Sequence, residues 1–131
     1  MSSKQAIVCV DDDPMIVLLL KEQLRISFGN QFNYESATDA SEALLLIDEL
    51  VEDGVNIILI LSDWLMPGIK GDEFIENVQN KYPGVKAIMI SGQIDPQSYQ
   101  ELQNKCKLSA FISKPWVHED LIHCVKKSLD E

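Results

Sequence analysis

Short apolar runs recur along the chain, and most of them have the length of a β-strand. Residues 6–10, 57–61 and 85–90 are almost continuously apolar, which is typical of strands covered on both faces. Weaker runs at 32–37 and 110–113 indicate two further strands. The pattern therefore predicts five strands.

Apolar residues between these runs recur at three- and four-residue intervals, as on one face of a helix. In three segments the recurring residues are Leu44, Ile47, Leu50 and Val51, then Phe74, Ile75 and Val78, then Leu121, Ile122, Val125 and Leu129. Asp39 and the pair Asp95-Pro96 favour helix starts, because a carboxylate caps free N–H groups and proline suits the first turn. Gly29 and Gly54 favour helix ends.

Two further predicted helices differ in how apolar they are. The first half of 14–28 is apolar almost all round, so we expect this helix to pack deeply against the sheet. Residues 97–107 carry only a narrow stripe of Tyr99, Leu102 and Cys106. We expect that segment to be the most mobile helix.

Strands and helices alternate along the chain, which favours a parallel sheet with right-handed crossovers. The predicted fold class is α/β: a doubly wound five-stranded parallel sheet with strand order 2-1-3-4-5, a flavodoxin-like (βα)5 arrangement. A chain of 131 residues, 46% of them hydrophobic, can bury one sizeable core. Because no repeat or linker interrupts the sequence, residues 1–131 are predicted to form a single domain.

The formal net charge of −10, from 21 acidic and 11 basic residues, argues against direct nucleic-acid binding, since phosphate backbones are bound by clustered Lys and Arg. Cys9, Cys106 and Cys124 lack the spacing of a disulfide framework, and His118 and His123 do not share one helical face for zinc. No signal sequence or membrane span is visible. We expect a cytoplasmic protein with reduced, packed cysteines and no membrane association.

Polar side chains follow the predicted strands. Asp11 and Asp12 follow the first strand, Asp63 the third, Ser91 the fourth and Lys114 the fifth. The carboxyl ends of parallel strands meet at one edge of a sheet, so we expect these side chains to converge. Singly, each has an ordinary explanation as a helix cap, a turn aspartate or a strand end. Their joint occurrence at successive strand ends favours a functional site.

Carboxylates gathered at one edge repel one another, and a hard divalent cation relieves that repulsion. Mg²⁺ prefers one or two carboxylates together with water and phosphate oxygens, so Mg²⁺ with a phosphoryl group is the guest predicted for Asp11, Asp12 and Asp63. Lys114 supplies a positive charge and Ser91 a hydroxyl, both suited to phosphoryl oxygens. One carboxylate remains to act as the nucleophile.

Four motifs occur in order along the chain: VDDDP at 10–14, SDWLMPGIKG at 62–71, ISG at 90–92 and FISKP at 111–115. They resemble the acidic pair, the phosphoacceptor loop, the switch hydroxyl, and the switch aromatic with its lysine in the receiver domains of bacterial two-component response regulators. The resemblance covers essentially the whole chain.

The resemblance implies that Asp63 accepts a phosphoryl group from a sensor histidine kinase or a phosphotransfer protein. It implies that Asp11, Asp12, Asp63 and the backbone carbonyl of Leu65 hold Mg²⁺. Lys114 would pair with the phosphoryl group and would precede a cis peptide bond to proline. Such a domain catalyses only its own phosphorylation and dephosphorylation, so we do not expect an enzyme with external turnover.

The resemblance also implies a switch that couples Ser91 with Phe111, where threonine and tyrosine are more usual in this family. The hydroxyl would move to the phosphoryl group and the ring would turn into the vacated space. Tyr99 and Trp116 would then lie on or near an output face formed by the helix at 97–107, the strand after it and the last helix. Ordinary core packing of these rings is the alternative.

Several features of such a domain stay open. Leu65 and Gln93 would flank the route of the water that removes the phosphoryl group, but they do not predict its lifetime. The sequence does not distinguish a stand-alone regulator from a piece of a longer protein. It leaves open a downstream effector, an attached output domain and a homodimer through the output face.

Two other functions are compatible with part of the pattern. In a haloacid-dehalogenase-like phosphohydrolase, Asp11 would be the nucleophile, but Met15 departs from that family's pattern. Pro14, which starts a helix at once, leaves no room for that family's flap. An unphosphorylated receiver that serves only as an interaction module would not need the complete set of polar groups.

Overall fold

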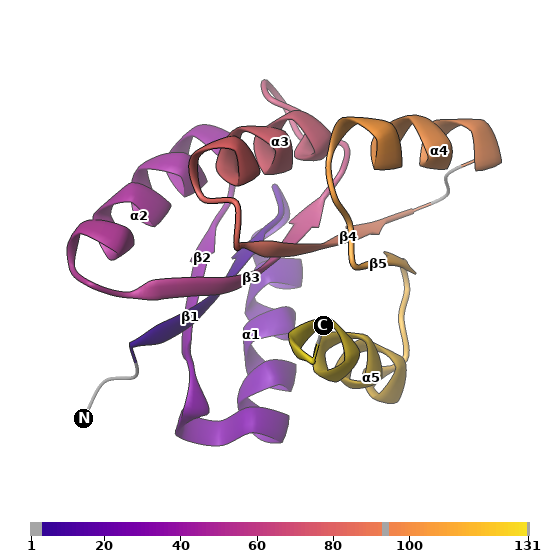
Figure 1. The fold of residues 1–131 in the computed structure, drawn as a ribbon. Coiled ribbons are helices and arrows are strands. Elements are labelled where there is room, and N and C mark those ends of the chain that lie inside the picture. The colour runs from indigo at the N-terminus through magenta and orange to yellow at the C-terminus, as the bar shows by residue number, and fades with distance from the viewer. Residues whose placement is uncertain (1–3, 93–94, 131) are drawn as a thin grey trace.

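The five strands described by the computed structural model, which covers residues 4–92 and 95–130, form one parallel sheet in the order β2-β1-β3-β4-β5 (Figure 1). The strands are β1 (Gln5–Val10), β2 (Asn33–Ala37), β3 (Asn56–Asp63), β4 (Lys86–Ser91) and β5 (Ala110–Ser113). The helices are α1 (Pro14–Phe28), α2 (Ala40–Glu52), α3 (Gly71–Lys81), α4 (Pro96–Lys105) and α5 (His118–Leu129), with a short 3₁₀ turn at Gly29–Gln31. The predicted doubly wound fold class is confirmed.

Helices cover both faces of the sheet: α1 and α5 lie on one side, and α2, α3 and α4 on the other (Figure 1). Successive side chains of a strand point to opposite faces. In β1, Val8 and Val10 therefore join the cluster under α2 and α3, whereas Ile7 and Cys9 join the cluster under α1 and α5. This two-sided burial explains why β1, β3 and β4 are apolar without alternation.

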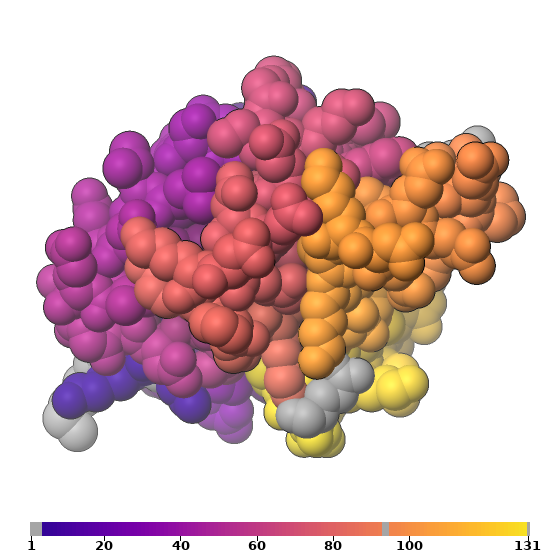
Figure 2. Space-filling model, turned by 45° about the horizontal axis from the view of Figure 1, so that its top comes forward, coloured from indigo at the N-terminus to yellow at the C-terminus, as the bar shows by residue number. Residues whose placement is uncertain are grey.

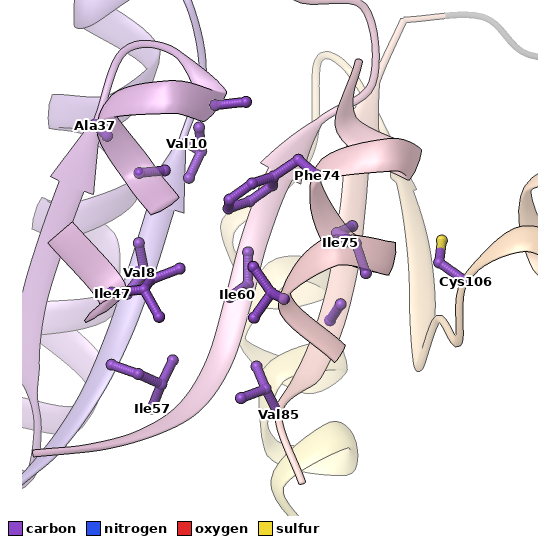
Figure 3. Packing of buried hydrophobic residues seen from close by; sticks show 14 of the residues in the cluster. Val8, Val10, Ala37, Ile47, Ile57, Ile60, Phe74, Ile75, Val85 and Cys106 are labelled. Carbon is purple, nitrogen blue, oxygen red and sulfur yellow. The ribbon is translucent and has the colours of Figure 1, made fainter. Parts of the chain in front are cut away.

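Phe74 of α3 is fully buried and anchors the first of these clusters. Ile47 of α2 and Ile60 of β3 belong to the same cluster, and Figure 3 shows their side chains pointing toward the space between helices and sheet. Ile47 and Phe74 are among the residues whose amphipathic spacing predicted α2 and α3.

Strand β3 extends two residues beyond the predicted range and ends at Asp63. Ser62 and Asp63 continue the ladder opposite Met89 and Ile90 of β4. The backbone supplies ladder hydrogen bonds whatever the side chain is, so an apolar run underestimates the length of such a strand. Asp63 therefore ends a strand and does not lie in a loop. The other strands begin and end within one residue of the predicted positions.

The predicted helix caps are confirmed. The carboxylate of Asp39 accepts a hydrogen bond from the N–H of Glu42 (2.7 Å), and that of Asp95 accepts one from the N–H of Ser98 (2.8 Å). Gly54 follows α2 with a φ of 84°, a conformation that glycine adopts without steric penalty.

Helix α1 is not packed as deeply as its composition suggests, and that prediction was wrong. One face is buried, but the other exposes Met15 (70%), Leu18 (58%) and Leu19 (45%). A helix lying on a sheet can bury only one stripe, and an all-round apolar sequence does not reveal which residues lie outside it. The buried residues are Val17, Leu20, Leu24 and Phe28.

Helix α4 is the least embedded helix of the described chain: Leu102 is its one buried residue. Figure 2 shows it projecting at one edge of the molecule beside α3. Its C-terminal end is tied to α3 by an ion pair between Lys105 and Asp72 (3.3 Å). The expected mobility of this helix stays a prediction.

All three cysteines are free thiols, as predicted, and two of them are buried. Burial raises the pKa of Cys9 to about 12 and that of Cys106 to about 11. These thiols pack as small apolar groups. Within the described ranges, no helix combines the length and apolar content needed to cross a bilayer.

Candidate functional site

Three carboxylates meet at the carboxyl edge of the sheet. Asp11 follows β1 directly, Asp12 comes next, and Asp63 ends the neighbouring strand β3. One oxygen atom from each carboxylate lies within 4.8 Å of the other two. Asp11 and Asp63 are buried and Asp12 is exposed. The predicted convergence of these side chains is therefore present in the fold.

The ammonium group of Lys114 lies in the same cluster. Its Nζ is 2.7 Å from Oδ2 of Asp11 and 3.5 Å from Oδ1 of Asp63. The backbone N–H of Lys114 donates to the carbonyl of Ser91 (2.7 Å), which fixes this residue to the end of the neighbouring strand. The Lys114–Pro115 peptide bond is cis, as the resemblance implies.

Burial and neighbouring charges change the pKa values of this cluster. Burial and the charge of Asp11 raise the pKa of Asp63, although Lys114 and the Trp64 N–H act against them. Burial acts to lower the pKa of Lys114, but its bond to Asp11 and the charges of both aspartates outweigh that effect and raise it. The site thus places the Lys114 ammonium group among carboxylates that are unfavourably close.

The acidic run after β1 also has a structural role. The carboxylate of Asp13 caps α1 by accepting the N–H of Met15 (2.9 Å), and Asp11 accepts the N–H of Asp13 (2.9 Å). Pro14 is the first residue of α1. Asp13 is therefore the residue of this acidic run that caps the helix, and Asp11 and Asp12 lie close to Asp63.

Ser91, the last residue of β4, is buried at the same edge of the sheet (3% exposed). Leu65 lies two residues beyond Asp63. Its aliphatic side chain has no ligating atom, so any metal ligand it offers is its backbone carbonyl. Phe111 lies on β5 and packs edge-to-face against Tyr99 of α4, with ring centroids 5.6 Å apart. Gln93 lies outside the described residues.

Trp116 contacts helix α1, and its expected place on or near the output face stays a prediction. Its indole N–H donates to the side-chain oxygen of Gln23 on α1 (2.8 Å). Its ring packs with the cluster under α1 and α5, and a cavity of about 260 Å³ lies beside it between α1 and Lys114. The residue therefore joins the β5–α5 connection to α1 and does not pack with Tyr99 and Phe111.

Sequence reasoning included Ser62 and Gly71 in the motif at 62–71 but assigned neither of them a role of its own. Ser62 is fully buried, and its hydroxyl donates to the Asp63 carbonyl (2.9 Å). Gly71 begins α3, and its N–H donates to the Trp64 carbonyl (2.7 Å). The available signal for the first of these residues was a serine placed between the apolar run at 57–61 and Asp63.

A family model described as the response regulator receiver domain matches residues 7–126. The chain therefore belongs to the response regulator receiver family of two-component signalling. Its five-stranded topology and the order of its acidic, hydroxyl and lysine residues agree with that assignment.

Individual relatives are similar over nearly the whole chain. The hydrogenase transcriptional regulatory protein HoxA of Cupriavidus necator is 33% identical over 130 residues, which are 99% of this chain and 25% of that protein. The DNA-binding response regulator MtrA of Mycolicibacterium smegmatis is 29% identical over 126 residues, 96% of this chain and 51% of that protein. This chain thus spans a quarter of HoxA and half of MtrA.

Solved structures show the same fold. A CheY-like response regulator receiver domain protein from Methanospirillum hungatei superposes with a TM-score of 0.81 and 28% identity, over 96% of this chain and 94% of that one.

Proposed function

We propose that this chain is a phospho-accepting receiver domain in which Asp63 takes a phosphoryl group from a phosphohistidine. The observation that carries the proposal is the convergence of three carboxylates and Lys114 at one sheet edge. In the transfer, a carboxylate oxygen of Asp63 attacks phosphorus and forms a P–O bond. The P–N bond breaks, and its electron pair returns to the imidazole nitrogen.

The donor set supports Mg²⁺ as the cofactor. Carboxylate oxygens within 4.8 Å of one another, from Asp11, Asp12 and Asp63, suit a hard cation that keeps several waters. The backbone carbonyl of Leu65 is the proposed fourth protein ligand. When bound, Mg²⁺ would neutralise charge that develops on the phosphoryl oxygens.

Two residues of this chain are proposed to bind the phosphoryl group. Lys114 already lies 3.5 Å from Asp63 and would pair with a phosphoryl oxygen. The Ser91 hydroxyl, at the end of β4, would donate to another. We propose that this second contact shifts Phe111 and hence the face of α4, β5 and α5. Such a change is a shift of population between two packings.

Exposed apolar side chains near the site support a protein as the phosphodonor. Met15, Leu65 and Val117, 70%, 56% and 56% exposed, lie within a few residues of the carboxyl ends of β1, β3 and β5. Exposed apolar side chains beside a polar site are compatible with a surface that binds another protein. We propose a sensor histidine kinase or a phosphotransfer protein as that partner.

We extend the proposal to the whole chain and to its partners. Residues 1–131 are proposed to form one receiver domain that acts in the cytoplasm without turnover of an external substrate. Its signal would pass to a downstream effector, an output domain or a second copy bound through the α4–β5–α5 face. HoxA and MtrA, which are named as transcriptional and DNA-binding regulators, support an output in gene regulation.

Intact-mass analysis after acetyl phosphate treatment, with and without Mg²⁺, tests the proposal. We expect one phosphoryl group on wild type with Mg²⁺, none on Asp63→Asn and much less on Asp11→Asn. Asp13→Asn is the matched control, because Asp13 caps α1 outside the cluster, and it should be labelled like wild type. Labelling that survives Asp63→Asn but not Asp11→Asn would instead favour the phosphohydrolase chemistry. No labelling of wild type would favour an unphosphorylated interaction module.

A further inference from the structure

The carbonyl oxygen of Asp63 is held by the residue before it. Ser62 is fully buried, and its Oγ donates to that carbonyl at 2.9 Å. Its neighbours in the sheet are Val10 and Met89, so the hydroxyl lies in apolar surroundings. Burying a hydroxyl there is unfavourable unless it is hydrogen-bonded, and this bond satisfies it.

The same carbonyl is confined by the first residue of α3. A Cβ atom on Gly71 would overlap the Asp63 carbonyl oxygen and would lie 2.9 Å from the Trp64 Cα. The Gly71 N–H also donates to the Trp64 carbonyl at 2.7 Å. Helix α3 can therefore begin against the end of β3 only because residue 71 has no side chain.

One rigid peptide plane connects these contacts to the carboxylate. The carbonyl of Asp63 and the N–H of Trp64 belong to the same planar peptide unit. That N–H donates to Oδ1 of Asp63 at 2.9 Å, the oxygen that lies 3.5 Å from Lys114. A rotation of this plane would consequently turn the carboxylate away from the cluster.

We propose that Ser62 and Gly71 are positioning residues for Asp63. They fix the 63–64 peptide plane, and through it the direction of the carboxylate and the path of the chain toward Leu65. This inference rests on the proposed phosphoacceptor function. Neither residue touches the phosphoryl group; each acts through the main chain of Asp63.

The test compares two buried serines that make the same kind of bond. Ser128 is 1% exposed, and its hydroxyl donates to the carbonyl of Cys124 at 2.8 Å in α5. Ser62→Ala and Ser128→Ala should therefore lose similar stability in urea unfolding. Only Ser62→Ala should be phosphorylated more slowly by acetyl phosphate at saturating Mg²⁺, by about tenfold, since small misplacements of a reacting group are costly.

Further measurements distinguish a positioning role of Ser62 from a general loss of stability. Ser62→Ala should also bind Mg²⁺ more weakly, measured by quenching of tryptophan fluorescence, whereas Ser128→Ala should not. Ser62→Thr, which keeps the hydroxyl, should recover most of the rate. Gly71→Ala should be phosphorylated more slowly by acetyl phosphate. Gly84→Ala, where no atom lies within 4 Å of an added Cβ, should be phosphorylated at the wild-type rate.

Failure of the two proposals gives different results. Wild type that takes up no phosphoryl group overturns the phosphoacceptor function itself. Wild type that is phosphorylated, together with a Ser62→Ala rate equal to that of Ser128→Ala, overturns the positioning role alone. If Gly71→Ala does not fold, the serine pair still decides the question.

Discussion

Replacing Lys114 by methionine should destabilise the metal-free protein, because it removes an ammonium group that pairs with the clustered carboxylates. Nζ lies 2.7 Å from Asp11 and 3.5 Å from Asp63. At an effective dielectric constant of about 20, these two attractions amount to about 6 and 5 kcal/mol before desolvation is counted. Removing one partner of a buried ion pair typically costs about 3–5 kcal/mol.

The free energy of unfolding lost in Lys114→Met should be smaller than these two attractions, and it has an upper limit. A carboxylate left without its partner can take up a proton, and moving its pKa from the ordinary 3.8 to the solution pH of 7 corresponds to about 4 kcal/mol. The Lys114 side chain is also 24% exposed, which reduces the effect of its removal. We therefore expect Lys114→Met to lose about 3 kcal/mol of unfolding free energy at neutral pH.

The loss should depend on pH with a definite sign. The folded-state pKa of Asp63 is already raised, and losing Lys114 removes an influence that lowers it. Below the ordinary aspartate pKa the Asp63 carboxyl is protonated in both the folded and the unfolded state, so its charge no longer destabilises the folded protein. As the pH rises from the ordinary pKa to the raised folded-state pKa, the unfolded state has released its proton while the folded state still holds it. Stability is therefore lost over this range of pH.

Urea unfolding followed by circular dichroism, in EDTA at pH 4.5 and pH 7.5, measures both effects. Wild type and Lys114→Met should be closer in stability at pH 4.5 than at pH 7.5. Mg²⁺ should recover stability in the variant, by about 2.7 kcal/mol at 100 times its Kd. Lys81→Met, which removes an exposed pair with Asp48 (side chains 60% and 39% exposed), should change stability far less. An equal loss in the two variants, or a Lys114→Met loss independent of pH, would refute the reasoning.

Three further substitutions test the packing by urea unfolding. Phe74→Ala, at a fully buried site, should lose about 3–5 kcal/mol; a loss under 1 kcal/mol would contradict the core assignment. Asp39→Ala removes the cap of α2 and should lose about 1 kcal/mol, whereas an unchanged midpoint would mean that the cap contributes nothing. Leu18→Ser, at a side chain 58% exposed, should stay within about 0.5 kcal/mol of wild type, and a core-sized loss would show that α1 is buried after all.

The fold was predictable because strands covered on both faces leave an unmistakable pattern. The runs that became β1 and β4 are apolar without alternation, and capping residues such as Asp39 and Asp95 mark the helices between them. The exposed side of α1 was not predictable in the same way. Met15 and Leu18 are as apolar as the buried Leu20, so composition alone does not show which of them faces the sheet.

The convergence of the polar groups was predictable, and the way they are held was not. Parallel strands end at one edge, which brings Asp11, Asp63 and Lys114 together once the strand order is known. The roles proposed for Ser62 and Gly71 depend on contacts of a few ångströms between β3 and the start of α3. Such contacts follow from the path of the backbone, which no local spacing of residues specifies.

The two distances from Lys114 connect metal binding to phosphoryl transfer in the proposed function. Its ammonium group lies closer to Asp11 than to Asp63, at 2.7 Å against 3.5 Å. Without a bound metal it therefore pairs mainly with Asp11, a proposed metal ligand. A cation bound by Asp11 would weaken that pair, since one carboxylate then shares its charge between two cations. Lys114 would become free to turn toward Asp63, where the negative charge of the phosphoryl group arrives. A bound cation would thus strengthen the pairing of Lys114 with Asp63, which is already present at 3.5 Å in the metal-free structure.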